Sequence, residues 1–345
     1  MGLREEIREQ PAVVARLIAD GRDSIERVAA TLEARGVDEI VIAARGTSDH
    51  AAVYAQYVLG ARLAMPVALA APSLVTLYGV EPKFGRSAVV GISQSGESPD
   101  VVAVVAAARR QGAPTIAITN SPDSPLARAA DATIDLAAGE ERAVAATKTY
   151  TAELTAIALL ALALGPQDAG AEAFLATLPS AIAAALEVEP AAERIAAARA
   201  GIGGAIVLGR GFEYATAREW ALKLKELVRL LADPYSSADF QHGPLALLEP
   251  GFPVFALAPS GPPADGQVEL LGRLRTDFQV DLVVASDRDD ALALGDGLRL
   301  PSGVPDWLMP IVSIVPAQLV AYHLARARGI DPDSPRHIRK VTRTR

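Results

Sequence analysis

The chain of 345 residues contains no cysteine. Disulfides, thiolate metal sites and a cysteine nucleophile are therefore excluded, and nothing points to an oxidising compartment. Long hydrophobic runs are also missing, because the most apolar one, Leu154 to Gly165, is too short to span a bilayer and predicts a buried helix. The N-terminus, MGLREEIREQP, is charged and lacks the apolar core of a signal peptide, so we predict a cytoplasmic protein.

The sequence contains fewer basic than acidic residues. The 33 Lys and Arg residues face 41 Asp and Glu residues, which gives a net charge of -8. Such a balance repels nucleic acid and anionic membrane surfaces, so we expect neither as a partner and favour a small molecule or a protein. The length exceeds that of a usual single domain, and two domains are expected, each with its own core.

Short β-branched runs alternate along the chain with alanine-rich stretches. Their hydrophobicity is continuous, as required of strands in a sheet that helices cover on both faces. This pattern predicts an α/β fold with two doubly wound parallel sheets, each in a three-layer sandwich with helices. The predicted strands are 39–44, 66–71, 88–92, 115–119 and 132–137 in the first half, and 205–211, 253–260, 281–286 and 297–301 in the second.

The two halves of the chain resemble each other locally. The stretches VIAARGTSDHAAVYA and IVLGRGFEYATAREWA both run from a strand through Arg-Gly into a helix with an aromatic residue near its second turn. We interpret them as two copies of one α/β unit; a chance likeness between two generic strand-to-helix turns is the alternative. The predicted division is a helical segment at 1–30, α/β domains at 31–190 and 195–335, and a C-terminal tail at 336–345.

A cluster of hydroxyl groups follows the strand at 88–92, in the stretch VVGISQSGES. Ser93, Ser95 and Ser98 offer donors, Gly96 lets the backbone approach a ligand, and the next helix directs its N-terminus to the carboxyl end of the sheet. These groups suit a phosphate monoester, whereas a plain helix cap needs one serine only. The stretch has neither the lysine of a Walker loop nor the glycine spacing of a dinucleotide fingerprint.

Two further segments are predicted to face the same ligand. Thr47 and Ser48 follow the first strand in ARGTSDHA, although either one alone would also serve as a helix cap. The stretch VAATKTYT, residues 144–151, opens the long buried helix and is expected to bring its backbone to the site.

A stripe of charges in REWALKLKELVRLL is the first candidate for acid and base chemistry. Glu219, Lys223 and Glu226 stand at i, i+4 and i+7, so they share one side of a helix next to its apolar face. They are expected to be either partly buried and mutually paired or a solvated Glu-Lys ladder. Spacing alone favours the solvated ladder.

Two histidines of the second half, His242 and His323, differ in their surroundings. His242 lies in the polar, turn-rich stretch 232–251 and precedes Gly-Pro, which predicts an exposed and rigid imidazole. His323, inside QLVAYHLARA, is predicted to be packed on a helix.

Six motifs together point to a known family. GTS, SQSGES, ATK, ALKLKE, QHGPLAL and PRHIRK occur in the order and at about the spacing found in sugar isomerase (SIS) domains, as in the isomerase half of glucosamine-6-phosphate synthase. The resemblance covers essentially the whole chain. It implies two tandem SIS domains that bind a hexose 6-phosphate and move protons between C1 and C2, with no metal or other cofactor.

The resemblance also implies a role for each matching residue. The phosphate and sugar would be bound by Ser93, Gln94, Ser95, Ser98, Thr47, Ser48, Val144 and Ala146. Glu226 would be the base that shuttles the proton, and His242, donated by the neighbouring subunit of a homodimer, would help to open the sugar ring. Lys223 would lie beside them, and Lys340 would reach from the tail toward the sugar carbonyl.

Three departures from the synthase pattern shape the predicted function. The sequence has neither a glutaminase domain nor its cysteine, so it is not expected to draw ammonia from glutamine. Ala146 replaces the serine of the family's ASTK motif, and the tail RKVTRTR is one residue shorter after its lysine. We predict conversion of glucosamine 6-phosphate to fructose 6-phosphate and ammonia. The alternatives are a fructosamine-6-phosphate deglycase, another ketose/aldose phosphosugar isomerase, or a non-catalytic phosphosugar sensor.

Overall fold

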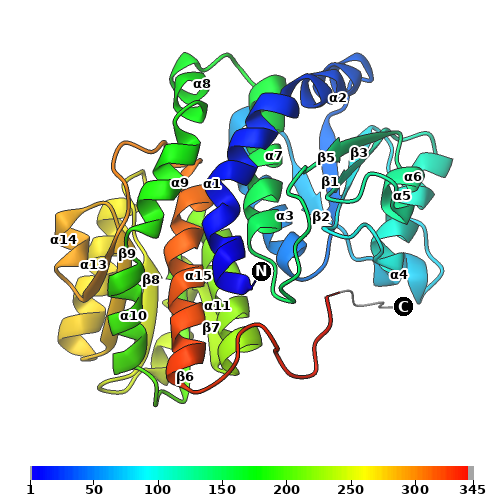
Figure 1. Cartoon of the computed structure of the whole chain (residues 1–345). Helices are drawn as coiled ribbons and strands as arrows, with labels where there is room; N and C mark the ends of the chain where they lie inside the picture. The colour runs from blue at the N-terminus through cyan, green and yellow to red at the C-terminus, as the bar shows by residue number, and fades with distance from the viewer. Residues whose placement is uncertain (1, 341–345) are drawn as a thin grey trace. The chain divides into compact units, whose positions relative to one another are not determined.

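A computed structural model describes residues 2–340 and contains two parallel five-stranded sheets (Figure 1). The first sheet consists of β1 (Glu39–Ala43), β2 (Val67–Leu69), β3 (Ser87–Ile92), β4 (Thr115–Thr119) and β5 (Ala132–Asp135). The second consists of β6 (Gly204–Gly209), β7 (Leu231–Ser236), β8 (Pro253–Leu257), β9 (Asp281–Ser286) and β10 (Asp296–Arg299). The predicted fold class is confirmed.

Both sheets have the same strand order. The first runs β2-β1-β3-β4-β5, and the second runs β7-β6-β8-β9-β10 when read from the matching edge. The direction of winding therefore reverses between β1 and β3 in the first sheet and between β6 and β8 in the second. A shared order of five strands supports two copies of one α/β unit, rather than a chance likeness between two turns.

Each sheet belongs to its own compact unit. The first-sheet unit holds Ala12–Glu141, Lys148–Ala176 and the tail from Arg339. The second-sheet unit holds the N-terminal residues up to Pro11, then Arg142–Thr147 and Thr177–Ile338.

Helices connect the strands and cover the sheets. Helix α1 (Leu3–Asp20) contributes to both units. The first-sheet unit contains α2 (Arg22–Ala34), α3 (Thr47–Leu63), α4 (Ser73–Thr76), α5 (Pro99–Arg110), α6 (Pro125–Ala129), α7 (Lys148–Leu164) and α8 (Ala169–Leu175). The second-sheet unit contains α9 (Leu178–Leu186), α10 (Glu189–Ala198), α11 (Glu213–Val228), α12 (Ser237–Phe240), the 3₁₀ helix η1 (Pro244–Leu247), α13 (Ala264–Asp277), α14 (Asp289–Leu292) and α15 (Met309–Ala327).

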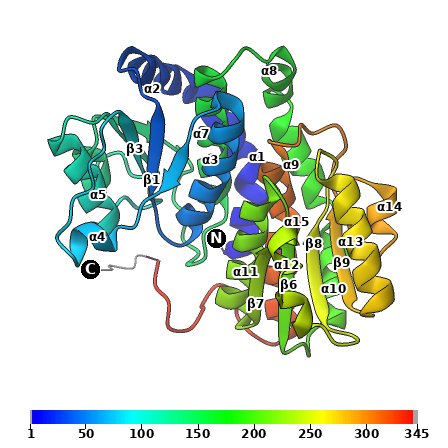
Figure 2. The same cartoon turned by 180° about the vertical axis from the view of Figure 1, so that it is seen from behind.

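Strand β8 shows why the strands are apolar throughout. Val254 packs in one buried cluster with Leu270 and Leu274 of α13. The next residue, Phe255, contacts Trp220 of α11 with their ring centroids 5.1 Å apart. Since successive side chains point to opposite faces of a sheet, both neighbours must be apolar when helices cover both faces, as α13 and α11 do in Figure 2.

Strand β7 was not among the predicted strands. It pairs in parallel with β6, and Pro234 lies opposite Val207. The sequence indicates only a polar, turn-rich stretch here, because the strand is half exposed and contains a proline. Its position at the edge of the sheet explains both features, since an edge strand tolerates a residue that donates no hydrogen bond.

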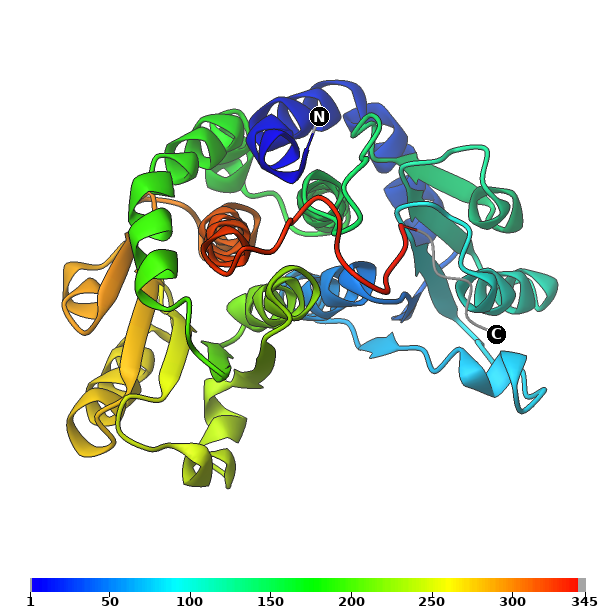
Figure 3. The same cartoon turned by 60° about the horizontal axis from the view of Figure 1, so that its bottom comes forward.

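The apolar run at 154–165 forms part of α7, whose residues are buried along nearly the whole helix. This confirms the predicted buried helix. Over residues 2–340 no single helix is long and apolar enough to cross a membrane; only α8 and α9 taken together reach that length and composition. In the second-sheet unit the long buried helix is α15, which packs beside α11 (Figure 3).

Candidate functional site

The serine loop, residues 93–98, leads from β3 into α5. Within it the Ser93 hydroxyl accepts a hydrogen bond from the Gly96 N–H at 3.1 Å, and the Ser95 hydroxyl accepts one from the Glu97 N–H at 3.3 Å. Ser98 is the N-cap residue of α5, but its hydroxyl makes no capping hydrogen bond within the described part of the chain. Capping therefore does not account for Ser98, while Ser93 and Ser95 help to shape the turn.

The serine loop is held in a fixed conformation. Gly96 has a φ of 63°, and a Cβ at this position would lie 2.0 Å from the Ser124 hydroxyl oxygen. The Gln94 carbonyl accepts hydrogen bonds from the Asn120 N–H at 3.0 Å and from the Thr119 hydroxyl at 3.3 Å. Only glycine combines this backbone conformation with so close a neighbour, so the loop keeps its shape through the fold around it.

The second loop at this edge of the first sheet leads from β1 into α3. Gly46 is the N-cap residue of α3, so neither Thr47 nor Ser48 caps this helix. The Ser48 side chain is buried and donates its hydroxyl hydrogen to Glu153 Oε1 at 2.7 Å. Thr47, the first residue of α3, is half-buried beside it in the chain.

An ion pair joins the two loops. Arg45, in the β1–α3 loop, places its Nε 2.6 Å from Oδ2 of Asp100, in the first turn of α5. Asp100 is buried and Arg45 is half exposed. Because β1 and β3 are neighbours in the sheet, this pair fixes both hydroxyl-bearing loops at the point where the winding reverses, which is where doubly wound sheets bind ligands.

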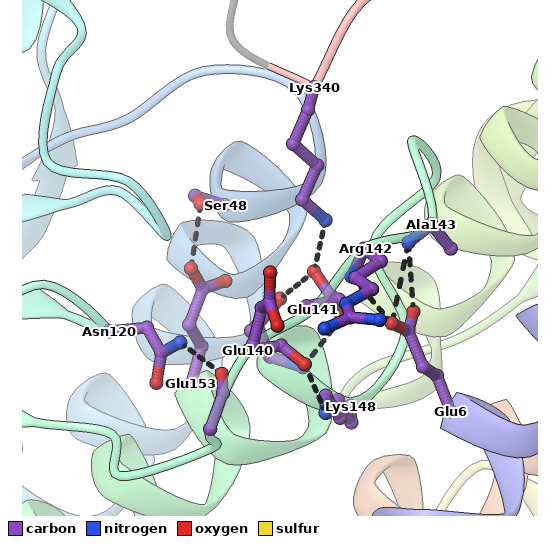
Figure 4. A network of polar contacts seen from close by, with 12 residues as sticks. Glu6, Ser48, Asn120, Glu140, Glu141, Arg142, Ala143, Lys148, Glu153 and Lys340 are labelled. Carbon is purple, nitrogen blue, oxygen red and sulfur yellow. Dashed lines mark hydrogen bonds and ion pairs between the residues drawn. The ribbon is translucent and has the colours of Figure 1, made fainter. Parts of the chain in front are cut away.

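A buried carboxylate in the first-sheet unit holds the tail lysine (Figure 4). Glu141 Oε2 lies 2.5 Å from Lys340 Nζ and accepts the Thr149 hydroxyl at 2.8 Å. Glu141 Oε1 accepts the Thr149 N–H at 3.1 Å. Sequence reasoning singled out Lys340 but not Glu141. The shortened end of the tail, residues 341–345, lies outside the described residues.

Val144 and Ala146 lie half-buried on the segment 142–147 of the second-sheet unit. The carboxylate of Glu6, completely buried on α1, accepts hydrogen bonds from the backbone N–H groups of Arg142 at 2.5 Å and Ala143 at 3.2 Å (Figure 4). Glu6 therefore fixes the backbone that leads into Val144 and Ala146.

The charged stripe of α11 is buried and mutually paired. Lys223 has no exposed side-chain surface, and its Nζ lies 3.2 Å from Glu219 Oε1 and 2.6 Å from Glu226 Oε2. Burial opposes the charge of Lys223, but attraction by the two carboxylates outweighs it and raises the pKa of Lys223 above its usual range. The solvated ladder that spacing favoured is wrong. Glu226 alone keeps 24% of its side chain exposed, so it is the carboxylate of the stripe that a ligand can reach.

A second buried carboxylate ties α11 to α15. Glu213 Oε2 accepts the Ser313 hydroxyl at 2.8 Å. Burial raises the pKa of Glu213 to about 7, although hydrogen bonds from Thr216 and Ser313 act in the opposite direction. The link holds the start of the helix that carries the charged stripe.

The two histidines lie in the surroundings predicted for them. His242 is exposed on a turn after α12, where its backbone N–H donates to the Asp239 carbonyl at 3.0 Å and Gly243 has a φ of 122°. His323 packs on α15 with its Nε2 3.1 Å from Glu189 Oε1. His242 is therefore presented to solvent, and His323 belongs to the packing of the second-sheet unit.

The predicted site residues thus form two sets. The first-sheet unit contains Thr47, Ser48, Ser93, Gln94, Ser95, Ser98 and Lys340, and the second-sheet unit contains Val144, Ala146, Lys223, Glu226 and His242. Within the second set, Lys223 and Glu226 are in contact, whereas His242 lies on a separate turn.

The family model of the SIS domain matches residues 35–163 and 203–328. The chain belongs to the SIS domain family. The two matched segments contain the first and second sheets, respectively, so each sheet is the centre of one SIS segment.

The curated relatives of this SIS protein include glutamine–fructose-6-phosphate aminotransferases. It is 37% identical over 345 aligned residues to the glutamine–fructose-6-phosphate aminotransferase of Thermococcus kodakarensis; the match covers 97% of this chain and 57% of that enzyme. This chain thus spans a little over half the length of the curated relatives that it matches.

Two solved structures resemble the SIS protein over nearly their whole length. One is a proposed phosphosugar isomerase from Silicibacter pomeroyi DSS-3, at a TM-score of 0.86 and 35% identity, covering 96% of this chain and 100% of that one. The other is the C-terminal domain of glucosamine-fructose-6-phosphate aminotransferase from Francisella tularensis, at a TM-score of 0.87 and 29% identity, covering 96% and 98%.

Proposed function

We propose that this protein converts glucosamine 6-phosphate to fructose 6-phosphate and ammonia. Its SIS family and its similarity to phosphosugar isomerases support an enzyme that acts on sugar phosphates. The observation that carries the proposal is the serine loop, because it brings several hydroxyls and the N-terminus of α5 to the winding reversal of the first sheet.

The phosphate would bind at the serine loop. A helix N-terminus favours an anion through its N–H groups and its dipole, and the hydroxyls of Ser95 and Ser98 supply further donors. Ser93 and Gln94 complete the phosphate site in this proposal. Thr47, Ser48, Val144 and Ala146 would bind the sugar in this proposal.

Glu226 would carry the proton between the two carbons. With the ring opened by His242, Glu226 takes the proton from C2, and a proton returned to C1 leaves an imine at C2. Water adds to this imine, the carbon–nitrogen bond breaks, and fructose 6-phosphate and ammonia leave. Lys223 holds Oε2 of Glu226, so Oε1 is the oxygen that accepts the proton, and Lys340 donates a hydrogen bond to the sugar carbonyl oxygen.

A substrate panel tests the reaction. The purified protein is incubated with hexosamine 6-phosphates and fructosamine 6-phosphates, and release of ammonia, amine and ketose is measured. Ammonia and fructose 6-phosphate from glucosamine 6-phosphate are the expected products. Amine release from fructosamine 6-phosphates alone would replace the proposal with a deglycase, and binding without turnover of any substrate would indicate a sensor.

His242 would complete the site of a neighbouring subunit in a homodimer. Its exposed position on a turn suits this role, because its imidazole is presented away from the core of its own unit. Mixing Glu226→Gln subunits with His242→Asn subunits should then restore part of the activity, while each variant alone stays inactive. No recovery after verified subunit exchange would show that both residues act within one chain.

A further inference from the structure

We propose that a pocket at the winding reversal of the second sheet binds an α-amino acid. The positively charged amino group of this ligand would enter the pocket, and its carboxylate would bind the guanidinium of Arg210 at the rim. The pocket belongs to the second-sheet unit and shares no residue with the phosphosugar site proposed above. The inference therefore goes beyond the proposed function and does not depend on it.

The pocket lies where doubly wound sheets bind their ligands. The loops that follow β6 and β8 line it with Arg210, Phe212 and the stretch 257–260, while Gln267 of α13 and Asp306, before α15, complete it. Its volume is about 20 Å³. A buried water needs roughly 10 to 15 Å³, so the pocket admits one group of that size, such as an amino group. The remainder of a ligand must lie at the rim.

Arg210 is the anion-binding group of this site. In the first-sheet unit the corresponding Arg45 pairs with Asp100, the second residue of α5. The second residue of α13 is also an aspartate, Asp265, but Arg288 pairs with it at 2.8 Å. Arg210 is exposed, and its guanidinium makes no hydrogen bond or ion pair with any described residue. One guanidinium balances one carboxylate, which it binds through two parallel hydrogen bonds.

Two buried acceptors line the pocket and select a donor. Glu213 is 4% exposed and accepts the Ser313 hydroxyl at 2.8 Å, but it forms no ion pair with any described cation. Burial raises the pKa of its carboxyl group to about 7. Gln267 is 5% exposed and donates its Nε2 to the Leu257 carbonyl at 3.1 Å, while its Oε1 accepts no hydrogen bond from the described part of the chain. An ammonium group would supply both the missing cation and the missing donor.

The closeness of the two charged residues favours a compact ligand. Arg210 and Glu213 share one turn, because the backbone N–H of Glu213 donates to the Arg210 carbonyl at 3.2 Å. A water molecule in the pocket would leave Glu213 without a cation and Arg210 without an anion. An α-amino acid carries its ammonium and carboxylate groups on adjacent carbon atoms. Phe212 and Pro263 add apolar walls that its side chain can contact.

Calorimetry on the whole chain tests the ligand class. The common amino acids are the first probes. The amino acid that binds most tightly is then compared with its 2-hydroxy acid, which lacks the positive charge, and with its carboxamide, which lacks the negative charge. The amino acid should bind at least about tenfold more tightly than either analogue, because each analogue loses one hydrogen-bonded charge.

Two variants test the residues. Arg210→Gln should reduce the preference over the carboxamide to about twofold or less, and Glu213→Gln should do the same to the preference over the 2-hydroxy acid. Each variant should keep the other preference. Arg273→Gln, at an exposed position of α13, is the matched control and should bind as the wild type does. Since Arg210 is exposed, Arg210→Gln tests the proposal even if Glu213→Gln fails to fold.

Three results would overturn the proposal. They are absence of binding by every amino acid in the panel, equal binding of the amino acid and either analogue, and unchanged preferences in Arg210→Gln and Glu213→Gln. No sugar phosphate and no turnover enter these measurements. Failure of this inference would therefore leave the proposed function untouched, and failure of the substrate panel above would leave this inference untouched.

Discussion

The two sheets share one strand order but carry different chemistry at their winding reversals. In the first sheet the loops contain the hydroxyls of Thr47 and Ser48 and of the serine loop. In the second, the corresponding loops run Arg-Gly-Phe at 210–212 and Ala-Pro-Ser-Gly-Pro-Pro at 258–263, and they line a pocket together with Gln267 and Asp306. The fold thus decides where a ligand site forms, and the loop sequence decides what that site binds.

The second-sheet unit contributes a different feature. Its helix α11 carries a buried lysine between two carboxylates, and one of these, Glu226, remains partly exposed. Under the proposed function the first-sheet unit supplies the groups that bind the phosphate, and the second-sheet unit supplies the base. The following changes should separate binding from proton transfer and from stability.

The largest effect is expected for Glu226→Gln. The amide keeps the shape of the side chain but cannot accept a proton at neutral pH, so kcat should fall by about 100- to 10,000-fold. The dissociation constant for glucosamine 6-phosphate should stay nearly unchanged. Steady-state kinetics measures kcat, and calorimetry measures the dissociation constant. Glu193→Gln, at an exposed position of α10, is the matched control. Normal turnover by Glu226→Gln would show that Glu226 is not the base and that the charged stripe has a structural role only.

Lys223→Met should cost stability. Removing the lysine leaves Glu219 buried without its cation, and breaking a buried ion pair from one side typically destabilises a protein by about 3 to 5 kcal/mol. Urea unfolding measures this loss. Lys225→Met, on the exposed side of the same helix, should change the free energy of unfolding by about 0.5 kcal/mol or less. Equal losses in both variants would contradict the buried pairing.

Glu213 should make stability depend on pH. Its folded pKa of about 7 exceeds the ordinary 4.5, so between these values the folded protein binds more protons than the unfolded chain. The contribution of Glu213 to the free energy of unfolding is fully present below pH 4.5. It decreases as the pH rises to 7 and then levels off. The total change is on the order of 3 kcal/mol. Glu213→Gln should lack this decrease in unfolding experiments across the range, and a variant with the wild-type slope would exclude Glu213 as its source.

The smallest expected effects compare equivalent loops of the two sheets. Ser95→Ala and Ser98→Ala should each weaken binding of glucosamine 6-phosphate by about 1 to 3 kcal/mol, because each removes a donor to a charged phosphate. Ser260→Ala, in the matching loop of the second sheet, should leave the dissociation constant unchanged in calorimetry. Unchanged binding in Ser95→Ala and Ser98→Ala would contradict a contact of these two hydroxyls with the phosphate.

Most strands could be predicted from the sequence because a strand covered on both faces is apolar at every position. The run at 115–119 is one such case, and β4 has the same limits. Strand β7 lacks this signal: Leu231 is exposed, Pro234 cannot donate to the sheet, and the remaining residues are mostly polar. An edge strand resembles a loop in sequence because half of its environment is solvent.

The loops of the site were predictable for a related reason, since their hydroxyls are adjacent in the chain. The carboxylates Glu153, Glu141 and Glu6 were missed, because they meet their partners across 105, 199 and 136 residues of sequence. No local pattern records such distant contacts. The available signal was an isolated acidic residue inside an otherwise apolar stretch, and Glu153 at the start of the apolar part of α7 has that signal.

The tight packing of Gly96 against Ser124 has a consequence for the thermodynamics of binding. The backbone of the serine loop is already ordered by its contacts with the end of β4 and the start of α6. A flexible loop would lose conformational entropy when an anion ordered it, whereas this loop loses that entropy once, when the chain folds. Affinity for a phosphate group at this position is therefore set mainly by the direction of its donors and little by the ordering of the chain.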